Sequence, residues 1–200
     1  MPRGGTASTV KVTSAPRRLA LAIVSYPSTL EPLFEAITLR LAKHAGAAFV
    51  VERCQDPDDV VYLARLWQRR GHAITRLDLY GHGAGGEFSM GDGVLFASDG
   101  TGFGRARQLG PLLARGADVR LLGCRTATEA VVPRRDGTRA SGTALLRGLE
   151  ERLRGGRRAW GTTDYLRAEH VAGADLAPSA LALLRRATHD SPGASSRRVG

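Results

Sequence analysis

The chain has 200 residues, a formal net charge of +10 at pH 7, 42% hydrophobic residues and two cysteines. This length favours one domain with a full core, and no apolar run approaches the roughly 20 residues that cross a bilayer. Two cysteines argue against a disulfide framework, and the polar start of the chain lacks the apolar centre of a signal peptide. Both features predict a cytoplasmic protein in a reducing compartment.

The basic balance does not by itself predict a nucleic-acid partner. Arginines are spread over the whole chain, Lys11 and Lys43 are the only lysines, and no aromatic residues alternate with the basic clusters. Net charge bears on non-specific association rather than on fold. We therefore expect no specific nucleic-acid partner and no membrane partner. A basic nucleic-acid-binding domain would instead show a steeply salt-dependent affinity.

The hydrophobic pattern alternates between strands and helices. Buried runs predict strands, and helical spacing predicts helices. In chain order these are a strand at 18–26, a helix at 30–44, a strand at 47–51, a helix at 56–70, a strand at 74–80, a hairpin at 87–98, a helix at 105–115, a strand at 118–123, a polar loop at 125–140, a helix at 141–153, a strand at 158–162 and a helix at 176–187. This order predicts an α/β fold, a three-layer α/β/α sandwich with a mainly parallel sheet.

The composition of the two ends differs from that of the middle. Residues 1–17 and 191–200 are rich in small polar residues, which is typical of disordered segments. The sequence therefore predicts one domain over 18–190 between a disordered N-terminal segment and a disordered C-terminal tail.

Two of the predicted strands end next to residues that can carry chemistry. His82 follows the strand 74–80, and Cys124 follows the strand 118–123. Parallel strands place their carboxyl ends along one edge of a sheet, and neighbouring strands lie about 5 Å apart. If these strands are neighbours, a His that can take a proton converges on a Cys that can attack. The structural alternatives are a flexible turn at His82 and a small buried thiol at Cys124.

The glycines around His82 match a cofactor motif only superficially. Residues 81–86 have the spacing G-x-G-x-x-G, but a hairpin pattern follows instead of the helix that would hold a pyrophosphate. We interpret these glycines as room for a substrate backbone to approach His82 and as freedom for a tight turn. The chain also lacks zinc-ligand spacing, a serine-hydrolase elbow and a phosphate-binding loop. We therefore expect no cofactor and no metal.

The other histidines and the second cysteine have no partner visible in the sequence. We expect Cys54 to be structural, and the remaining histidines to be solvated surface residues. These histidines are His44, His72, His170 and His189.

Several motifs together resemble the caspase-like (clan CD) cysteine peptidases. They are Leu79-Tyr80-Gly81-His82-Gly83, Gly91-Asp92-Gly93, Leu121-Leu122-Gly123-Cys124, the Gly-led helix and the strand Ala159-Trp160-Gly161-Thr162-Thr163. That group includes caspases, clostripain, gingipains and the self-processing protease domains of large bacterial toxins. The chain is most similar to bacterial caspase-like domains of unknown function. The resemblance covers about residues 77–164 and implies a caspase-like sheet.

The resemblance implies a cysteine endopeptidase that acts on a peptide or protein substrate. Cys124 would be the nucleophile and His82 its proton-transfer partner, while the backbone N–H groups of Gly83 and Cys124 would hold the oxyanion. A pocket beside the Cys strand sets the residue preference in this group. Asp164 is our candidate for lining that pocket, which predicts cleavage after Arg or Lys. Many members need no third residue to orient the His, and the sequence names none.

The segment after Cys124 departs from the family pattern, because residues 125–140 form a long basic stretch. Arg134, Arg135 and Arg139 would suit self-cleavage by a protease with a basic preference. Toxin relatives are switched on by inositol hexakisphosphate, so the resemblance also implies an activating partner or polyanion. The alternative function is a catalytically inert caspase-like interaction module that has kept the His and the Cys without a competent pocket.

Overall fold

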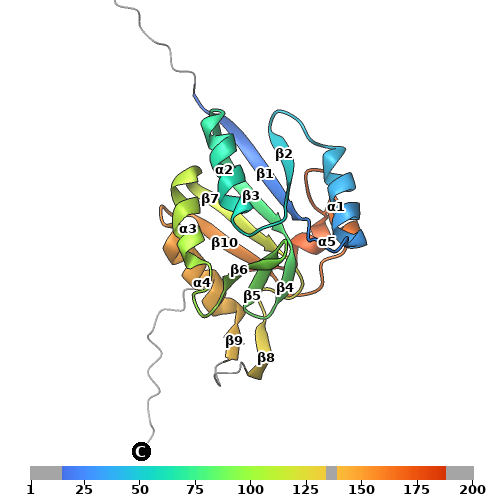
Figure 1. Ribbon diagram of the computed structural model, residues 1–200, viewed down its shortest axis with the longest axis vertical. Coiled ribbons are helices and arrows are strands. Elements are labelled where there is room, and N and C mark those ends of the chain that lie inside the picture. The colour runs from blue at the N-terminus through green and yellow to red at the C-terminus, as the bar shows by residue number, and fades with distance from the viewer. Residues whose placement is uncertain (1–14, 134–138, 188–200) are drawn as a thin grey trace, which may run out of the picture.

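The computed structural model describes residues 15–133 and 139–187, and its centre is a six-stranded sheet (Figure 1). The strand order is β13-β10-β7-β3-β1-β2, and every neighbouring pair is parallel except β10 and β13. The strands are β1 (Arg17–Ser25), β2 (Phe49–Cys54), β3 (His72–Tyr80), β7 (Leu113–Leu122), β10 (Arg158–Thr162) and β13 (Leu184–Arg186). The mainly parallel sheet predicted from the strand–helix alternation is confirmed.

Helices cover both faces of this sheet. They are α1 (Pro32–Ala42), α2 (Asp59–Arg69), α3 (Phe103–Leu109), α4 (Gly142–Leu153) and α5 (Pro178–Leu181). Successive residues of β1 show the division, since Leu21 and Ile23 belong to one buried cluster and Ala22 and Val24 to another. The first cluster packs under α2, α3 and α4, and the second packs under α1 and α5 (Figure 1). The three-layer α/β/α arrangement is therefore confirmed.

A small antiparallel sheet follows β3 at the edge where the parallel strands end. It contains β4 (His82–Ala84), β5 (Glu87–Met90) and β6 (Gly93–Ala97). The predicted hairpin turns at Gly91, whose φ of 56° is open to glycine and costly for other residues. A Cβ atom there would also lie 1.7 Å from the carbonyl oxygen of Gln55. The hairpin is pinned to β1 because the Ser25 hydroxyl accepts the Gly91 N–H at 2.8 Å.

Two segments between β6 and α4 differ from the sequence predictions. The helix predicted over 105–115 ends at Leu109, and one 3-10 turn over Gly110–Leu112 leads directly into β7. Pro111 lies in this turn and has no N–H to continue a helix. The segment 125–140 contains the strands β8 (Glu129–Pro133) and β9 (Arg139–Ser141) rather than a loop throughout.

The helix predicted over 176–187 is wrong. This segment holds the end of β12 (Asp175–Leu176), the four-residue α5 and the strand β13. β13 pairs antiparallel with β10, with Thr162 opposite Leu184. The backbone groups at that edge of β10 need partners, and strand pairing with a distant segment overrides the local helical spacing.

The predicted disordered ends lie mostly outside the described residues, and β1 begins at Arg17, within the predicted N-terminal segment. In the two described ranges, every helix is too short or too polar to cross a membrane.

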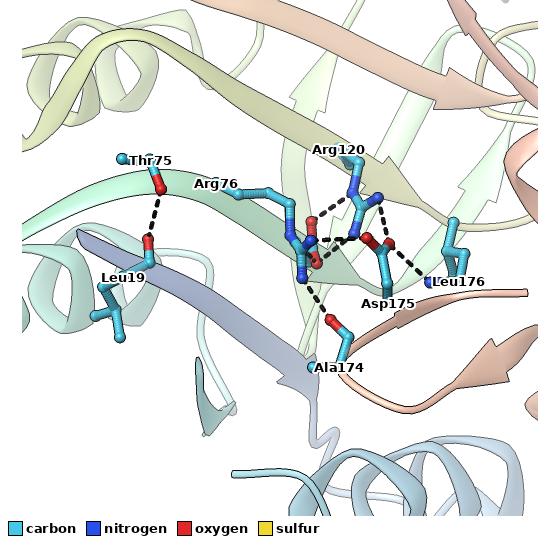
Figure 2. A network of polar contacts seen from close by, with 8 residues as sticks. Leu19, Thr75, Arg76, Arg120, Ala174, Asp175 and Leu176 are labelled. Atoms are coloured by element: carbon cyan, nitrogen blue, oxygen red, sulfur yellow. Dashed lines mark hydrogen bonds and ion pairs between the residues drawn. The ribbon is translucent and has the colours of Figure 1, made fainter. Parts of the chain in front are cut away.

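A network of charged side chains ties β3 and β7 to the hairpin of β11 (Val171–Ala172) and β12, as Figure 2 shows. Asp78 and Arg120 are opposite one another in the register, are 1% and 5% exposed, and share two hydrogen bonds of 2.6 Å. Arg120 also donates to Asp175 at 2.7 Å, and Arg76 donates to the other oxygen of Asp175 at 2.8 Å. Partial burial alone would raise the pKa of Asp175, but the hydrogen bond and charge of Arg120 outweigh it and leave that pKa lowered.

We expect Arg120→Met to reduce the free energy of unfolding by about 2–4 kcal/mol, because the buried Asp78 carboxylate loses both hydrogen bonds from Arg120 and keeps only the Arg76 Nε at 3.0 Å. Replacing both partners, as in Asp78→Leu/Arg120→Met, should restore at least half of the loss. Urea denaturation measures both. As a control, Arg53→Met breaks an ion pair with Glu35 whose side chains are 40% and 37% exposed, and should cost less than about 1 kcal/mol. Equal losses in Arg120→Met and Arg53→Met would contradict this account.

Candidate active site

The loops that carry His82 and Cys124 start from neighbouring strands. β3 and β7 pair in parallel, with Tyr80 opposite Leu122, and the Gly81 N–H continues the pairing by donating to the Leu122 carbonyl at 3.2 Å. His82 and Cys124 therefore each lie two residues beyond a register pair, at the same edge of the sheet. The condition set in the sequence analysis, that these two strands are neighbours, is therefore met.

Glycines allow the two loops to touch through their backbones. A Cβ atom on Gly83 would lie 2.9 Å from the backbone nitrogen of Cys124, and one on Gly123 would lie 2.8 Å from the backbone nitrogen of Gly83. Real Cβ atoms do not approach backbone so closely, so side chains are excluded at both positions. The other loop thus fills the space beside Gly83, while the interpretation of glycines 81–86 as room for a substrate stays a prediction, since Gly83 and Gly85 also line an open cleft. The same contact places Gly83 and Cys124, the two predicted oxyanion donors, side by side.

The end of β10 holds the Cys124 loop from the other side. The buried Thr162 hydroxyl donates to the carbonyl oxygen of Gly123. The Arg125 N–H donates to the Asp164 carbonyl at 3.1 Å, and the Ala127 N–H donates to the Thr162 carbonyl at 2.8 Å. Arg125 has a φ of 54°, a left-handed conformation that non-glycine residues adopt only when their surroundings impose it. The chain thus reverses sharply directly after Cys124.

His82 has a side-chain partner that the sequence did not indicate. Its Nε2 atom lies 2.7 Å from Oε1 of Glu31, and the imidazole makes a T-shaped contact with the Phe34 ring at a centroid distance of 4.9 Å. Because a carboxylate only accepts hydrogen bonds, Nε2 donates and Nδ1 is the nitrogen left for another partner. Glu31 directly precedes α1 and lies 51 residues before His82. An acidic residue before a helix-starting Pro was the only available signal.

Cys124 lines an open cleft of about 330 Å³. The other residues of its wall come from β4, from the Cys124 loop, from β8 and from the loop after β10. They are Gly83, Ala84, Gly85, Arg125, Thr128, Glu129, Ala130 and Tyr165. The His82 side chain is half exposed and is not part of this wall. Among the described residues, no hydrogen bond joins its imidazole to Cys124, which is a free and partly exposed thiol.

Asp164, the predicted specificity residue, lies beside this cleft but not in its wall. Its carboxylate accepts the Tyr165 N–H at 2.8 Å and faces a neighbouring hollow of about 280 Å³. The acidic residue that lines the Cys124 cleft is Glu129. Its carboxylate accepts the Thr143 N–H at 3.2 Å, at the start of α4. Partial burial would raise the pKa of Glu129, but hydrogen bonds from Ser141 and Thr143 leave it lowered, so the carboxylate stays ionised.

The arginines predicted for self-cleavage are only partly described. Arg139 begins β9, whereas Arg134 and Arg135 lie outside the described residues. His, Cys, Asp and Glu side chains form no group of three or more suited to a metal ion within the described ranges. Comparison with protein families, curated proteins and solved structures finds no match to this chain.

The two thiols should differ sharply in reactivity. Burial, followed by the charges of Asp59 and Asp56, raises the pKa of Cys54 to about 12, so this thiol stays protonated between pH 7 and 9. We expect iodoacetamide to modify Cys124 and to spare Cys54 in the native protein, with both modified after denaturation. Peptide mass spectrometry after digestion measures each site. Comparable modification of Cys54 in the native protein would contradict its burial.

Proposed function

We propose that the chain is a caspase-like cysteine endopeptidase with Cys124 as its nucleophile. The observation that carries the proposal is the contact between the Gly83 and Cys124 backbones in the wall of an open cleft. His82 directly precedes Gly83 in the chain. This contact brings a thiol and two candidate oxyanion donors to one point, where a peptide carbonyl can bind. The sheet edge is also where open α/β folds place their sites.

In the proposed reaction, His82 takes the proton of the Cys124 thiol and the sulfur attacks the carbonyl carbon of the scissile bond. The backbone N–H groups of Gly83 and Cys124 donate to the carbonyl oxygen as it becomes negative. His82 then gives the proton to the leaving amine, and a water molecule, deprotonated by His82, hydrolyses the thioester. Each oxyanion donor of this type contributes about 10²–10³-fold in rate.

In the proposed site, Glu31 is a positioning residue for the His82 imidazole. It holds Nε2 of His82 and leaves Nδ1 as the nitrogen that would exchange a proton with Cys124. Orientation of a catalytic imidazole by a third group is a recurring requirement of such sites. The helix that follows Glu31 is anchored in the core by Phe34, Ile37 and Leu41, so the carboxylate is presented from a rigid element.

One observation favours the alternative, an inert interaction module. The imidazole is bonded to Glu31 and is absent from the wall of the Cys124 cleft, so the described arrangement is a His–Glu pair beside a free thiol. The activating partner or polyanion implied by the family resemblance would, in the peptidase proposal, bring imidazole and thiol together. The peptidase proposal also includes self-cleavage of the chain within residues 125–140.

Labelling with peptide acyloxymethyl ketones separates the two functions. We expect labelling of the native chain to be lost in Cys124→Ala, to fall by about 10²–10⁴-fold in His82→Ala and by at least about tenfold in Glu31→Gln. Cys54→Ser is the matched control and should label normally. If iodoacetamide modifies Cys124 while no ketone probe labels it, with or without inositol hexakisphosphate, the chain is the inert module.

A second experiment addresses residue preference. We propose that a basic side chain precedes the cleaved bond and that Glu129 binds it in place of Asp164, with the exposed Tyr165 packing on its stem. Glu129→Gln keeps an acceptor for the Thr143 N–H and should lower kcat/KM for Arg substrates about 10–100-fold, while Asp164→Asn leaves it unchanged. Because Arg125 lines the same cleft, preferential cleavage after acidic residues that is lost in Arg125→Gln would overturn the basic preference.

A further inference from the structure

The turn Gly91-Asp92-Gly93 makes a contact that the proposed reaction does not use. Oδ1 of Asp92 accepts the Ser28 N–H at 2.9 Å and the Ser28 hydroxyl at 3.1 Å, across 64 positions of the chain. Ser28 is exposed and lies between β1 and α1, three residues before Glu31. The turn between β5 and β6 is thus bonded to the segment that carries the partner of His82.

The turn itself is held against the main sheet by its backbone. The Asp92 N–H donates to the Gln55 carbonyl at 3.0 Å, and the Gly91 N–H donates to the buried Ser25 hydroxyl at 2.8 Å. Ser25 ends β1, and Gln55 directly follows β2. Because two successive residues of the turn are bonded to these strand ends, Asp92 presents its carboxylate acceptor from a fixed position.

The segment between β1 and α1 depends on this acceptor. In the part of the chain that the structure describes, Ser28 makes the only hydrogen bonds of residues 27–30, and Thr29 and Leu30 are exposed. Glu31 has an extended backbone and only then enters α1, so the helix fixes it on one side. Three residue steps from Ser28 span at most about 11 Å, so the bonds of Ser28 restrict Glu31 on the other side.

His82 and Asp92 belong to the same small sheet. The pairing of β4 with β5 places His82 opposite Ser89, three residues before Asp92. The contacts therefore close a ring. It runs from His82 to Glu31, along the chain back to Ser28, across to Asp92 and through the β4–β5 pairing to His82 again. In this ring, the bonds between Ser28 and Asp92 determine where the Glu31 carboxylate meets the imidazole.

We propose that Asp92 is a positioning residue for His82. It holds the Ser28 segment, and this segment directs the Glu31 carboxylate to Nε2 of the imidazole. Nδ1 is then left for proton exchange with Cys124, and this consequence rests on the proposed function. An Asp92 that only stabilised the hairpin would leave the environment of the imidazole unchanged when it is replaced.

Heteronuclear NMR of the side-chain nitrogens of His82 tests this role in the full chain without any substrate. Glu31→Ala sets the reference, because it removes the acceptor of Nε2 and moves the Nε2 resonance toward that of a water-exposed imidazole. We expect Asp92→Ala to move this resonance in the same direction by at least about a third of that change. Ser28→Ala should move it less, since the backbone N–H at that position still donates.

Two variants are controls for this measurement. Asp92→Asn keeps an oxygen that can accept both bonds from Ser28, so it should leave the His82 resonance in place. Asp99→Ala removes another exposed carboxylate, which accepts the Thr101 N–H at 2.8 Å in the turn after β6, and should also leave the resonance in place. Thermal melting shows which variants are folded, and Ser28→Ala carries the test if Asp92→Ala is not.

Labelling with the ketone probes separates this inference from the proposed function. If Cys124 is the nucleophile, Asp92→Ala should slow labelling about 3–10-fold. The double variant Glu31→Ala/Asp92→Ala should label no more slowly than Glu31→Ala, because both residues act along one path. A shifted His82 resonance in a chain that no probe labels would support the positioning role and contradict the peptidase proposal.

Three outcomes would overturn the inference. A His82 resonance that stays in place in folded Asp92→Ala, while Glu31→Ala shifts it, would make Asp92 a stabiliser of the hairpin alone. Equal shifts in Asp92→Ala and Asp99→Ala would mean that any lost carboxylate loosens the small sheet. Labelling losses that multiply in the double variant would mean that Asp92 and Glu31 act independently.

Discussion

The parallel pairing of β3 with β7 is the constraint on which the candidate site depends. It sets Tyr80 opposite Leu122, so that the next residues of both strands leave the sheet together. Side chains alternate between the faces of a sheet, and a slip of one residue would move every side chain of β7 to the other face. Asp78 would then remain buried while Arg120 pointed away from it. The buried Asp78–Arg120 pair thus favours one register of β7 on β3, and this register determines where Cys124 lies relative to His82.

Backbone contacts then complete the site with little help from large side chains. The loops meet at Gly83 and Gly123, Thr162 holds the Gly123 carbonyl, and Asp164 holds the N–H of Arg125 through its own carbonyl. Because these contacts are made by the main chain, they constrain the position of Cys124 while leaving the residues of the cleft wall free to vary. A glycine at 83 or 123 is accordingly required by close approach of the other loop rather than by flexibility.

Local sequence patterns were sufficient to predict the elements that local interactions determine. Continuous apolar runs located β1, β3 and β7, and turn residues located the hairpin at Gly91. Pairing between segments far apart in the chain has no local sequence pattern. The segment that contains β13 was therefore predicted as a helix, although β13 completes the sheet beside β10. Glu31 was missed for the same reason, since its contact with His82 joins residues 51 positions apart. The role of Asp164 in residue preference stays a prediction, and the structure adds Glu129 as the acidic residue that lines the Cys124 cleft while Asp164 lines the neighbouring hollow.

The proposed peptidase and the alternative inert module would differ in the placement of one side chain rather than in the fold. The backbones on either side of the cleft are held by strand pairing and by the contacts of Thr162 and Asp164, so a loop rearrangement would break several hydrogen bonds. The imidazole of His82 is half exposed, pairs with Glu31 and makes a T-shaped contact with the Phe34 ring. Rotations of exposed side chains are fast and cost little. In the peptidase proposal, the side-chain torsions of His82 set the direction of its Nδ1, and the hydrogen bond to Glu31 biases them.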